Sequence, residues 1–133
     1  KREKAKDFVG TAAALHGLGA ALYLSLMGPQ GMRDLGRHIL QKTQYALKKL
    51  SAIKGVRARF RSAPFKEFVV DFSGAGKSGG KVNRHLLRQG IFGGKDLGGE
   101  FPELRGCALY CFTEMVTQAD IDRLAGARKG YLG

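Results

Sequence analysis

A chain of 133 residues is long enough for one domain with a hydrophobic core and too short for two. Apolar residues make up 44% of it, a proportion typical of a globular protein that excludes a disordered chain. The 23 Lys and Arg residues exceed the 11 Asp and Glu residues and give a net charge of +12, which favours an anionic partner: a nucleic acid, an anionic membrane or an acidic protein.

The first predicted element is an apolar segment at residues 8–27, which follows a charged lead at 1–7. Its length and basic flank fit a transmembrane helix or an uncleaved signal, although many small residues lower its mean hydropathy and no A-x-A-like cleavage site follows. The alternative is a helix buried nearly all round against other protein. The small residues that would let this helix pack closely are Gly10, Ala13, Gly17 and Ala21.

Gly28-Pro29 predicts the end of this helix and the start of a second one, because Pro is favoured in a first helical turn. Apolar residues then keep helical spacing to Leu50, and Gly55 closes the helix. The composition of residues 56–60 and 67–72 predicts two strands joined by a turn at 61–64.

The second half of the chain predicts a loop, two helices and another strand. A Gly/Ser/Lys loop at 73–80 leads to a short helix at 81–89, which Gly90 caps. An apolar run at 107–112 predicts a strand, and the segment 117–120 carries the start signal of a final helix. Residues 126–133 are expected to fray. Mainly antiparallel strands with helices on one side predict the α+β class.

The loop after Asp71 has some features of a phosphate-binding P-loop. Gly76-Lys77-Ser78 matches the end of that motif, between a strand and a helix. However, Asp71 stands where the motif requires its first Gly, and no second strand ending in a metal-binding Asp follows. A bare G-x-G-x-x-G pattern, which is a weak signal, lies at Gly74, Gly76 and Gly79. A plain mobile loop is the favoured interpretation, and nucleotide binding the lesser one.

No other residues form a self-contained catalytic or metal site in the sequence. Cys107 and Cys111 would share one strand face, too far apart for an easy disulfide, and they lack the further Cys or His that zinc needs. We therefore expect buried thiols in a reducing compartment, which favours the cytoplasm. Three histidines without metal-type spacing lie in different predicted helices, at His16, His38 and His85. Aromatic residues are not interleaved with the basic clusters, so a nucleic-acid surface has little support.

Short words that match one protein family run through the chain in that family's order. They include REKA at 2–5, MGPQGMR at 27–33, EFVV at 67–70, DLG at 96–98 and PEL at 102–104. In this order and spacing the whole chain resembles the C-terminal part of subunit 1 of the glycine cleavage system P-protein, the decarboxylating glycine dehydrogenase. It departs from the family's usual words at residues 6–11 and at Lys66.

The resemblance implies the aspartate-aminotransferase-like fold, fold type I of the enzymes that use pyridoxal phosphate (PLP). This chain would be the small C-terminal domain, an antiparallel sheet with helices packed on it, preceded by a long buried helix. Residues 1–50 would be linking helices that leave a large domain absent here, and residues 51–133 would be the small domain. The membrane interpretation of residues 8–27 is then no longer favoured, and no membrane partner is expected.

The resemblance also implies an activity. The family decarboxylates glycine with PLP and passes the aminomethyl group to the lipoyl arm of the acidic H-protein. In its two-subunit, heterotetrameric form the Schiff-base lysine belongs to subunit 2. The chain would therefore bind no PLP and be inactive alone. It has no His-Lys dipeptide like that of the family's cofactor site, and the substrate-carboxylate arginine of many such enzymes falls near Leu109.

Two surfaces are candidates for contact with subunit 2 and with H-protein. The residues expected at the subunit or active-site junction are Gly93, Gly94, Lys95, Asp96, Thr113 and Glu114. Turn geometry and helix capping explain these residues equally well. The basic residues expected to steer H-protein are Arg57, Arg59, Arg61, Lys66, Lys77 and Lys81. The alternative function is a stand-alone basic module that binds an anionic partner, for which nucleic acid is the obvious test ligand.

Overall fold

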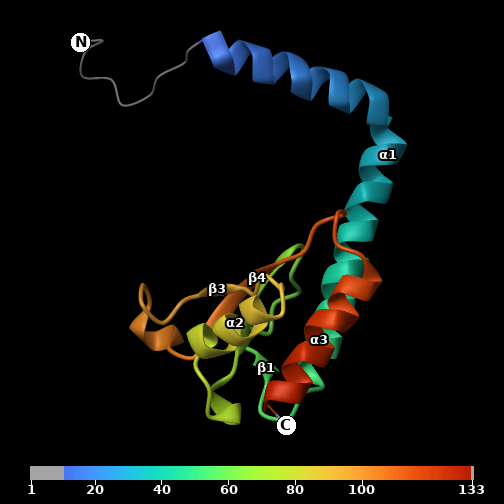
Figure 1. Ribbon diagram of the computed structural model, residues 1–133. Helices are drawn as coiled ribbons and strands as arrows, with labels where there is room; N and C mark the ends of the chain where they lie inside the picture. The colour runs from blue at the N-terminus through green and yellow to red at the C-terminus, as the bar shows by residue number, and fades with distance from the viewer. Residues whose placement is uncertain (1–10, 133) are drawn as a thin grey trace, which may run out of the picture. The chain divides into compact units, whose positions relative to one another are not determined.

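The longest element of the computed structural model, which describes residues 11–132 and their side chains from Ala13 onward, is the helix α1, Thr11–Ser51 (Figure 1). Gly28 interrupts it with φ 61° and ψ 178°, directly before Pro29. Positive φ costs Gly little, and Pro fits the first turn of the helix that follows. The predicted break between two helices is therefore confirmed. By packing, the chain divides into two units, Lys1–Gly36 and Arg37–Gly133.

The described part of the first unit is an exposed helix. Every side chain from Ala13 to Leu26 is exposed within this chain, so the expected burial is not provided by the described residues. The large apolar side chains on one stripe of the helix are Leu15, Leu18, Leu22 and Leu26. None of the described helices combines the length and the apolarity that a membrane crossing requires.

The second unit is built on an antiparallel sheet of four strands in the order β1-β2-β4-β3. The strands are β1 (Arg57–Ala58), β2 (Glu67–Asp71), β3 (Lys95–Asp96) and β4 (Cys107–Cys111). The long central ladder pairs β2 with β4 and places Phe68 opposite Tyr110. The predicted strands are confirmed, although β1 is shorter than expected. β3 was not predicted, because two charged residues carry no apolar alternation.

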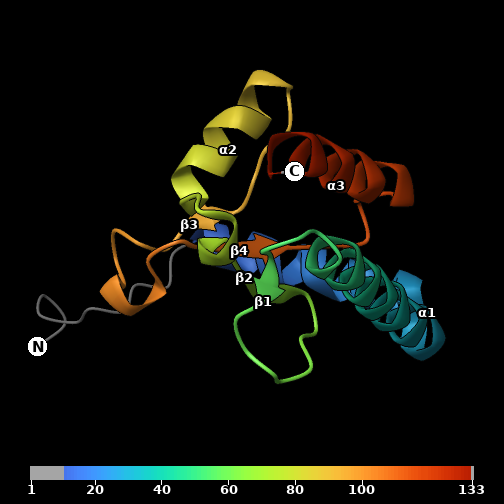
Figure 2. The same cartoon turned by 90° about the horizontal axis from the view of Figure 1, so that it is seen from below.

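Helices α2 (Gly79–Arg88) and α3 (Gln118–Leu132) lie on one face of the sheet, as Figure 2 shows. Alternate residues of β2 and β4 point to this face, and they are apolar or aromatic: Phe68, Val70, Ala108 and Tyr110. The opposite face of the sheet carries both apolar and polar side chains. The C-terminal end of α1 contributes to the same core. Core residues with little or no exposed surface include Ala46, Leu50, Val70, Phe72, Val82, Leu86, Ala108 and Ile121.

The C-terminal residues form regular structure rather than the expected frayed tail. α3 continues to Leu132, and its residue Arg128 is fully buried. The sequence did not predict these last turns of α3, because Gly126, Lys129 and Gly130 interrupt the apolar pattern of the helix. Burial of the last turns comes from tertiary contacts, which a local pattern does not record.

Candidate functional site

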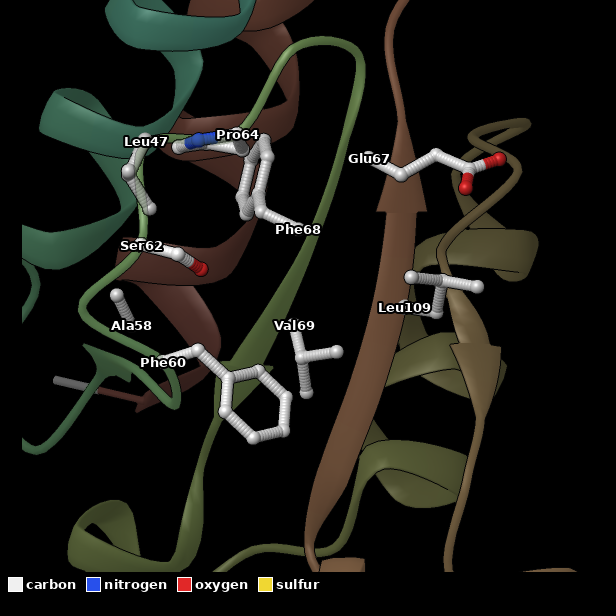
Figure 3. A pocket seen from close by; sticks show the side chains of 9 residues that line it. All are labelled: Leu47, Ala58, Phe60, Ser62, Pro64, Glu67, Phe68, Val69 and Leu109. Carbon is white, nitrogen blue, oxygen red and sulfur yellow. The ribbon is translucent and has the colours of Figure 1, made fainter.

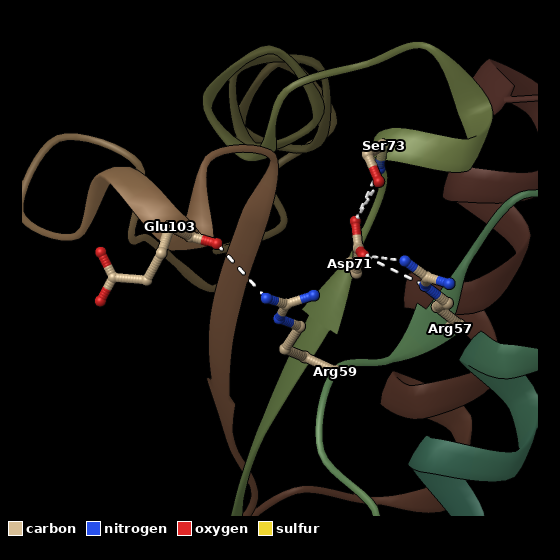
Figure 4. A network of polar contacts seen from close by, with 5 residues as sticks. All are labelled: Arg57, Arg59, Asp71, Ser73 and Glu103. Atoms are coloured by element: carbon tan, nitrogen blue, oxygen red, sulfur yellow. Dashed lines mark hydrogen bonds and ion pairs between the residues drawn. The ribbon is translucent and has the colours of Figure 1, made fainter.

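Asp71, at the end of β2, lies at the centre of a polar network on the outer face of the sheet (Figure 4). Asp71 is 3% exposed, and its carboxylate accepts hydrogen bonds from Ser73 N at 2.9 Å and Ser73 Oγ at 2.6 Å. The Arg57 guanidinium donates to its other oxygen at 3.0 and 3.1 Å. Burial alone would raise the pKa of Asp71, but the bonds from Ser73 and Arg57 outweigh it and lower that pKa.

Both cysteines are free, and they lie at the two ends of β4, Cys107 next to this network and Cys111 away from it. Cys107 pairs with Asp71 in the ladder, and burial raises the pKa of its thiol, as does the neighbouring carboxylate. Cys111 is exposed, so the expectation of two buried thiols is wrong for that residue. It is exposed because it is the last residue of β4, where the sheet's outer face opens to solvent.

A small pocket of about 130 Å³ lies between the β1–β2 loop and the sheet (Figure 3). Leu109, near which the substrate-carboxylate arginine of many fold type I enzymes is expected to fall, lines this pocket with Val69 and Phe60. The other lining residues are Leu47, Ala58, Ser62, Pro64, Glu67 and Phe68. Glu67 is the one charged residue of this lining, so the pocket has no group that would bind a carboxylate.

The predicted P-loop segment has a different structure. Ser73–Ala75 is a turn of 3-10 helix, and the Lys77 ammonium lies 4.9 Å from the centre of the Tyr131 ring. The Asp96 carboxylate lies at the N-terminus of α2, so close that a Cβ on Gly80 would be 2.6 Å from its Oδ2. A helix N-terminus with its own carboxylate offers no free site for a phosphate. The nucleotide-binding interpretation is therefore unsupported.

The four predicted junction residues that precede β4 along the chain lie together beside it. Gly93 and Gly94 pass so close to α2 and β4 that an added Cβ on Gly94 would lie 2.6 Å from the Tyr110 ring. Lys95 and Asp96 form β3, and Lys95 Nζ lies 2.7 Å from a Glu100 oxygen. These contacts position the segment, and none of them identifies a partner.

The other two predicted junction residues follow β4. Thr113 Oγ1 accepts a hydrogen bond from Met115 N at 3.3 Å, and the Glu114 carbonyl accepts one from Lys42 Nζ. This bond stabilises the turn that follows β4. The Glu114 side chain is exposed.

The expected basic face contains side chains that are already engaged. Arg57 contacts Asp71, Lys77 lies over Tyr131, and Arg59 donates to the Glu103 carbonyl at 3.5 Å. Exposed side chains without such contacts remain at Arg61, Lys66 and Lys81.

Sequence reasoning missed a small network that joins α2 to β4. The Asn83 side-chain nitrogen donates a hydrogen bond to the Gly94 carbonyl. The Asn83 side-chain oxygen accepts one from the Tyr110 hydroxyl at 3.2 Å. No local pattern of the sequence connects Asn83 with a residue 27 positions away. Among the described residues, no three His, Cys, Asp or Glu side chains are grouped to hold a metal.

Comparison with protein families gives a match over nearly the whole chain. The model of the glycine cleavage system P-protein family matches residues 1–127. A probable glycine dehydrogenase (decarboxylating) subunit 1 from Desulforamulus reducens is 42% identical over 132 residues, and its counterpart from Moorella thermoacetica is 38% identical. These matches cover 99% of this chain and 29% of each relative, so the chain spans less than a third of their length.

Solved structures agree with these matches. A crystal structure of glycine decarboxylase (P-protein) of the glycine cleavage system, in inhibitor-bound form, matches 97% of this chain and 28% of that chain, with TM-score 0.81 and 29% identity. A C-DES mutant with glycine covalently linked to its PLP cofactor matches 96% of this chain and 31% of that chain, with TM-score 0.68 and 18% identity, which shows the fold alone. The predicted fold class is confirmed, and the stand-alone binding module finds no support. The chain belongs to the glycine cleavage system P-protein family.

Proposed function

We propose that this chain is the C-terminal small-domain part of a P-protein subunit 1, in the glycine dehydrogenase that decarboxylates glycine and transfers the aminomethyl group to lipoylated H-protein. The observation that carries the proposal is the match of 97% of the chain to a P-protein structure with TM-score 0.81. The relatives named subunit 1 support the assignment to that subunit rather than to its partner.

The described residues do not fit a PLP site of their own. The Gly-Lys-Ser loop, the one segment with phosphate-binding character, leads to a helix whose N-terminus faces Asp96. Its Lys77 ammonium lies over the Tyr131 ring, where it is engaged by a cation–π contact. We therefore assign the cofactor, and the lysine that would bind it, to the partner subunit 2. The contribution of this chain is structural: it supports the assembly and walls its active-site region.

Association with further protein explains the exposed helix of the first unit. Leu22 and Leu26 are 58% and 87% exposed within this chain, on a helix too polar to cross a membrane. Apolar stripes of this kind are covered in functional proteins. We assign the cover to the large domain or to subunit 2 in a cytoplasmic heterotetramer. Residues 1–50 would be the linking helices, although residues 37–50 pack within the same unit as the proposed small domain, 51–133.

We keep six residues as our proposal for the junction with subunit 2 or the active site: Gly93, Gly94, Lys95, Asp96, Thr113 and Glu114. Their support is position: Gly93, Gly94 and Lys95 line a hollow beside β4. The exposed basic residues Arg61, Lys66 and Lys81 would steer the acidic H-protein. Steering by charge predicts that association with H-protein weakens as salt increases.

Assembly is the first test of this proposal. The whole protein that contains this chain is co-expressed with the candidate subunit 2, and a tag on one of them is used for purification. We expect the two to co-purify as a complex with two copies of each, and the visible absorbance of bound PLP to require subunit 2. If the protein binds PLP equally well alone, the assignment of the cofactor to subunit 2 is wrong.

A further inference from the structure

A second concave region of the small domain lies beside the edge of β4, next to the segment 91–94 that leads into β3. It has a volume of about 480 Å³, and most of its lining is apolar, including Ile91, Phe112, Val116 and Leu124. A smaller hollow of about 200 Å³ reaches Arg84 and Leu87 of α2, and both hollows share Phe92, Gly93 and Gly94. We call the two together the β4-edge groove. Phe92 stands in it with 93% of its surface exposed.

The backbone of β4 is open on this side. β2 pairs with β4 as far as Cys111, whereas β3 pairs with it only at Ala108 and Leu109. The bond from Phe112 N to Lys66 O points toward β2, so by alternation the N–H and C=O of Cys111 point toward the groove. Among the described residues these two groups have no hydrogen-bond partner. An open strand edge beside an apolar hollow is a setting in which sheets bind extended peptides.

The rim of the β4-edge groove is positively charged. Arg84 and Leu87 line the smaller hollow, and Leu87 is 59% exposed. Arg88 does not line either hollow, but it is exposed one helical turn beyond Arg84 on α2. Neither arginine has an acidic partner among the described residues. Two acidic side chains nearby are engaged: Glu100 pairs with Lys95, and Asp120, which lines the larger hollow, accepts bonds from Thr117. Glu67 is exposed opposite Cys111, on the β2 side of β4. On the α2 side of the groove the unpaired charge is therefore cationic.

We propose that the β4-edge groove binds an extended acidic segment of a partner protein. An apolar side chain of that segment would fill the hollow beside Phe92, its backbone would pair with Cys111, and its carboxylates would contact Arg84 and Arg88. A second copy of this chain, at a net charge of +12, has the wrong charge for this rim. A nucleic acid would leave the backbone of Cys111 unpaired and the apolar lining unfilled. The inference does not rest on the proposed enzyme activity, but it competes with the proposed junction: Gly93, Gly94 and Lys95 line the same hollow, and a junction that fills it would exclude the segment.

A synthetic peptide tests the proposal on the whole protein, assembled with its subunits. The probe is a fluorescent peptide of alternating Glu and Val with a central Phe, and fluorescence anisotropy measures its affinity. We expect the double variant Arg84→Glu/Arg88→Glu and the single variant Phe92→Ala each to weaken binding by about tenfold or more. The matched control is Lys48→Glu/Lys54→Glu, an equal charge reversal at two exposed residues near the C-terminal end of α1, which should leave affinity unchanged.

Two further measurements complete the test. Binding should slow hydrogen exchange at the Cys111 amide, because that N–H becomes paired. A peptide with every Glu replaced by Lys should not bind. Equal losses from both charge reversals would overturn the proposal, because attraction would then depend on overall charge. Absence of binding to the whole protein would overturn it as well, because its own chains would then cover the groove.

Discussion

Arg128 is fully buried, and none of its three guanidinium nitrogens has a hydrogen-bond partner among the described residues. Its Cζ lies 4.8 Å from the centre of the Phe72 ring and 4.3 Å from that of Tyr110. Burial lowers the pKa of Arg128 to about 9, so the group is still a cation at neutral pH. Two ring faces favour this cation, yet its donors remain without acceptors, which is costly in a core.

Replacement of this cation should therefore stabilise the domain. Arg128→Met keeps an unbranched apolar chain between the two rings and removes the unpaired donors. We expect the free energy of unfolding to rise by about 1–4 kcal/mol, measured by urea denaturation. Lys129→Met, on the exposed side of the same helix, should change it little. A loss of stability in Arg128→Met would show that the cation–π contacts outweigh the unmet hydrogen bonds.

Asp71 should stabilise the domain through its charged form. Asp71→Asn removes charge from the bonds with Ser73 and Arg57, so we expect a loss of about 1–3 kcal/mol at neutral pH. Because folding lowers the pKa of Asp71, its contribution is complete above the unfolded value and is lost as pH falls through the lower folded one. Unfolding measured from pH 7 to acid should show this loss in the wild type.

The same titration identifies the groups responsible. The Asp71→Asn variant should show a shallower decline of stability below about pH 4 than the wild type. Arg57→Gln should cost less than Asp71→Asn, because the Arg57 side chain is 71% exposed. Parallel pH profiles for the wild type and Asp71→Asn would contradict the stated role of the carboxylate.

Gly94 has no room for a side chain. An added Cβ would lie 2.6 Å from Tyr110 Cε2 and closer still to the Leu109 carbonyl. Gly94→Ala should therefore destabilise the domain by about 1–3 kcal/mol in thermal or urea unfolding. Gly99→Ala is the matched control, because nothing lies within 4 Å of its added Cβ. Equal stability of the two variants would mean that the 90–94 loop is free to shift.

At the scale of elements, the sequence predicted the start of α3 better than its end. Thr117 and Asp120 predicted the start of α3, and the structure shows their reciprocal bonds at 2.9 and 3.2 Å. The end of α3 and the short strand β3 were not predictable, because both depend on contacts with distant segments. The glycines of the candidate site could be predicted, whereas Asn83, which holds the Gly94 carbonyl, could not.

The cap of α3 offers a direct test at this scale. Thr117→Ala removes the hydroxyl that accepts from Asp120 N and should cost about 1 kcal/mol of stability. Thr117→Ser keeps the hydroxyl and should stay within a few tenths of a kcal/mol of the wild type. Helical circular dichroism followed during thermal unfolding distinguishes them. If both variants unfold like the wild type, the cap does not stabilise α3.

At the scale of the whole molecule, the exposed apolar stripe of α1 (Leu15, Leu18, Leu22 and Leu26) is expected to be covered by further protein. Leu22→Glu/Leu26→Glu should reduce self-association of the isolated chain, measured by light scattering, because it breaks that stripe. In the whole protein the same change should weaken assembly. Met115→Glu alters a single exposed residue, 79% exposed and outside the stripe, and should affect neither. Unchanged assembly would contradict a covered stripe.

We propose above that this chain is part of a working glycine dehydrogenase, and glycine decarboxylation tests this directly. The most direct measurement is release of labelled carbon dioxide from carboxyl-labelled glycine, with the whole protein, subunit 2, PLP and lipoylated H-protein present. We expect release of label that requires both subunits and is absent with either alone. A correctly assembled, PLP-loaded complex that releases no label from glycine would contradict it.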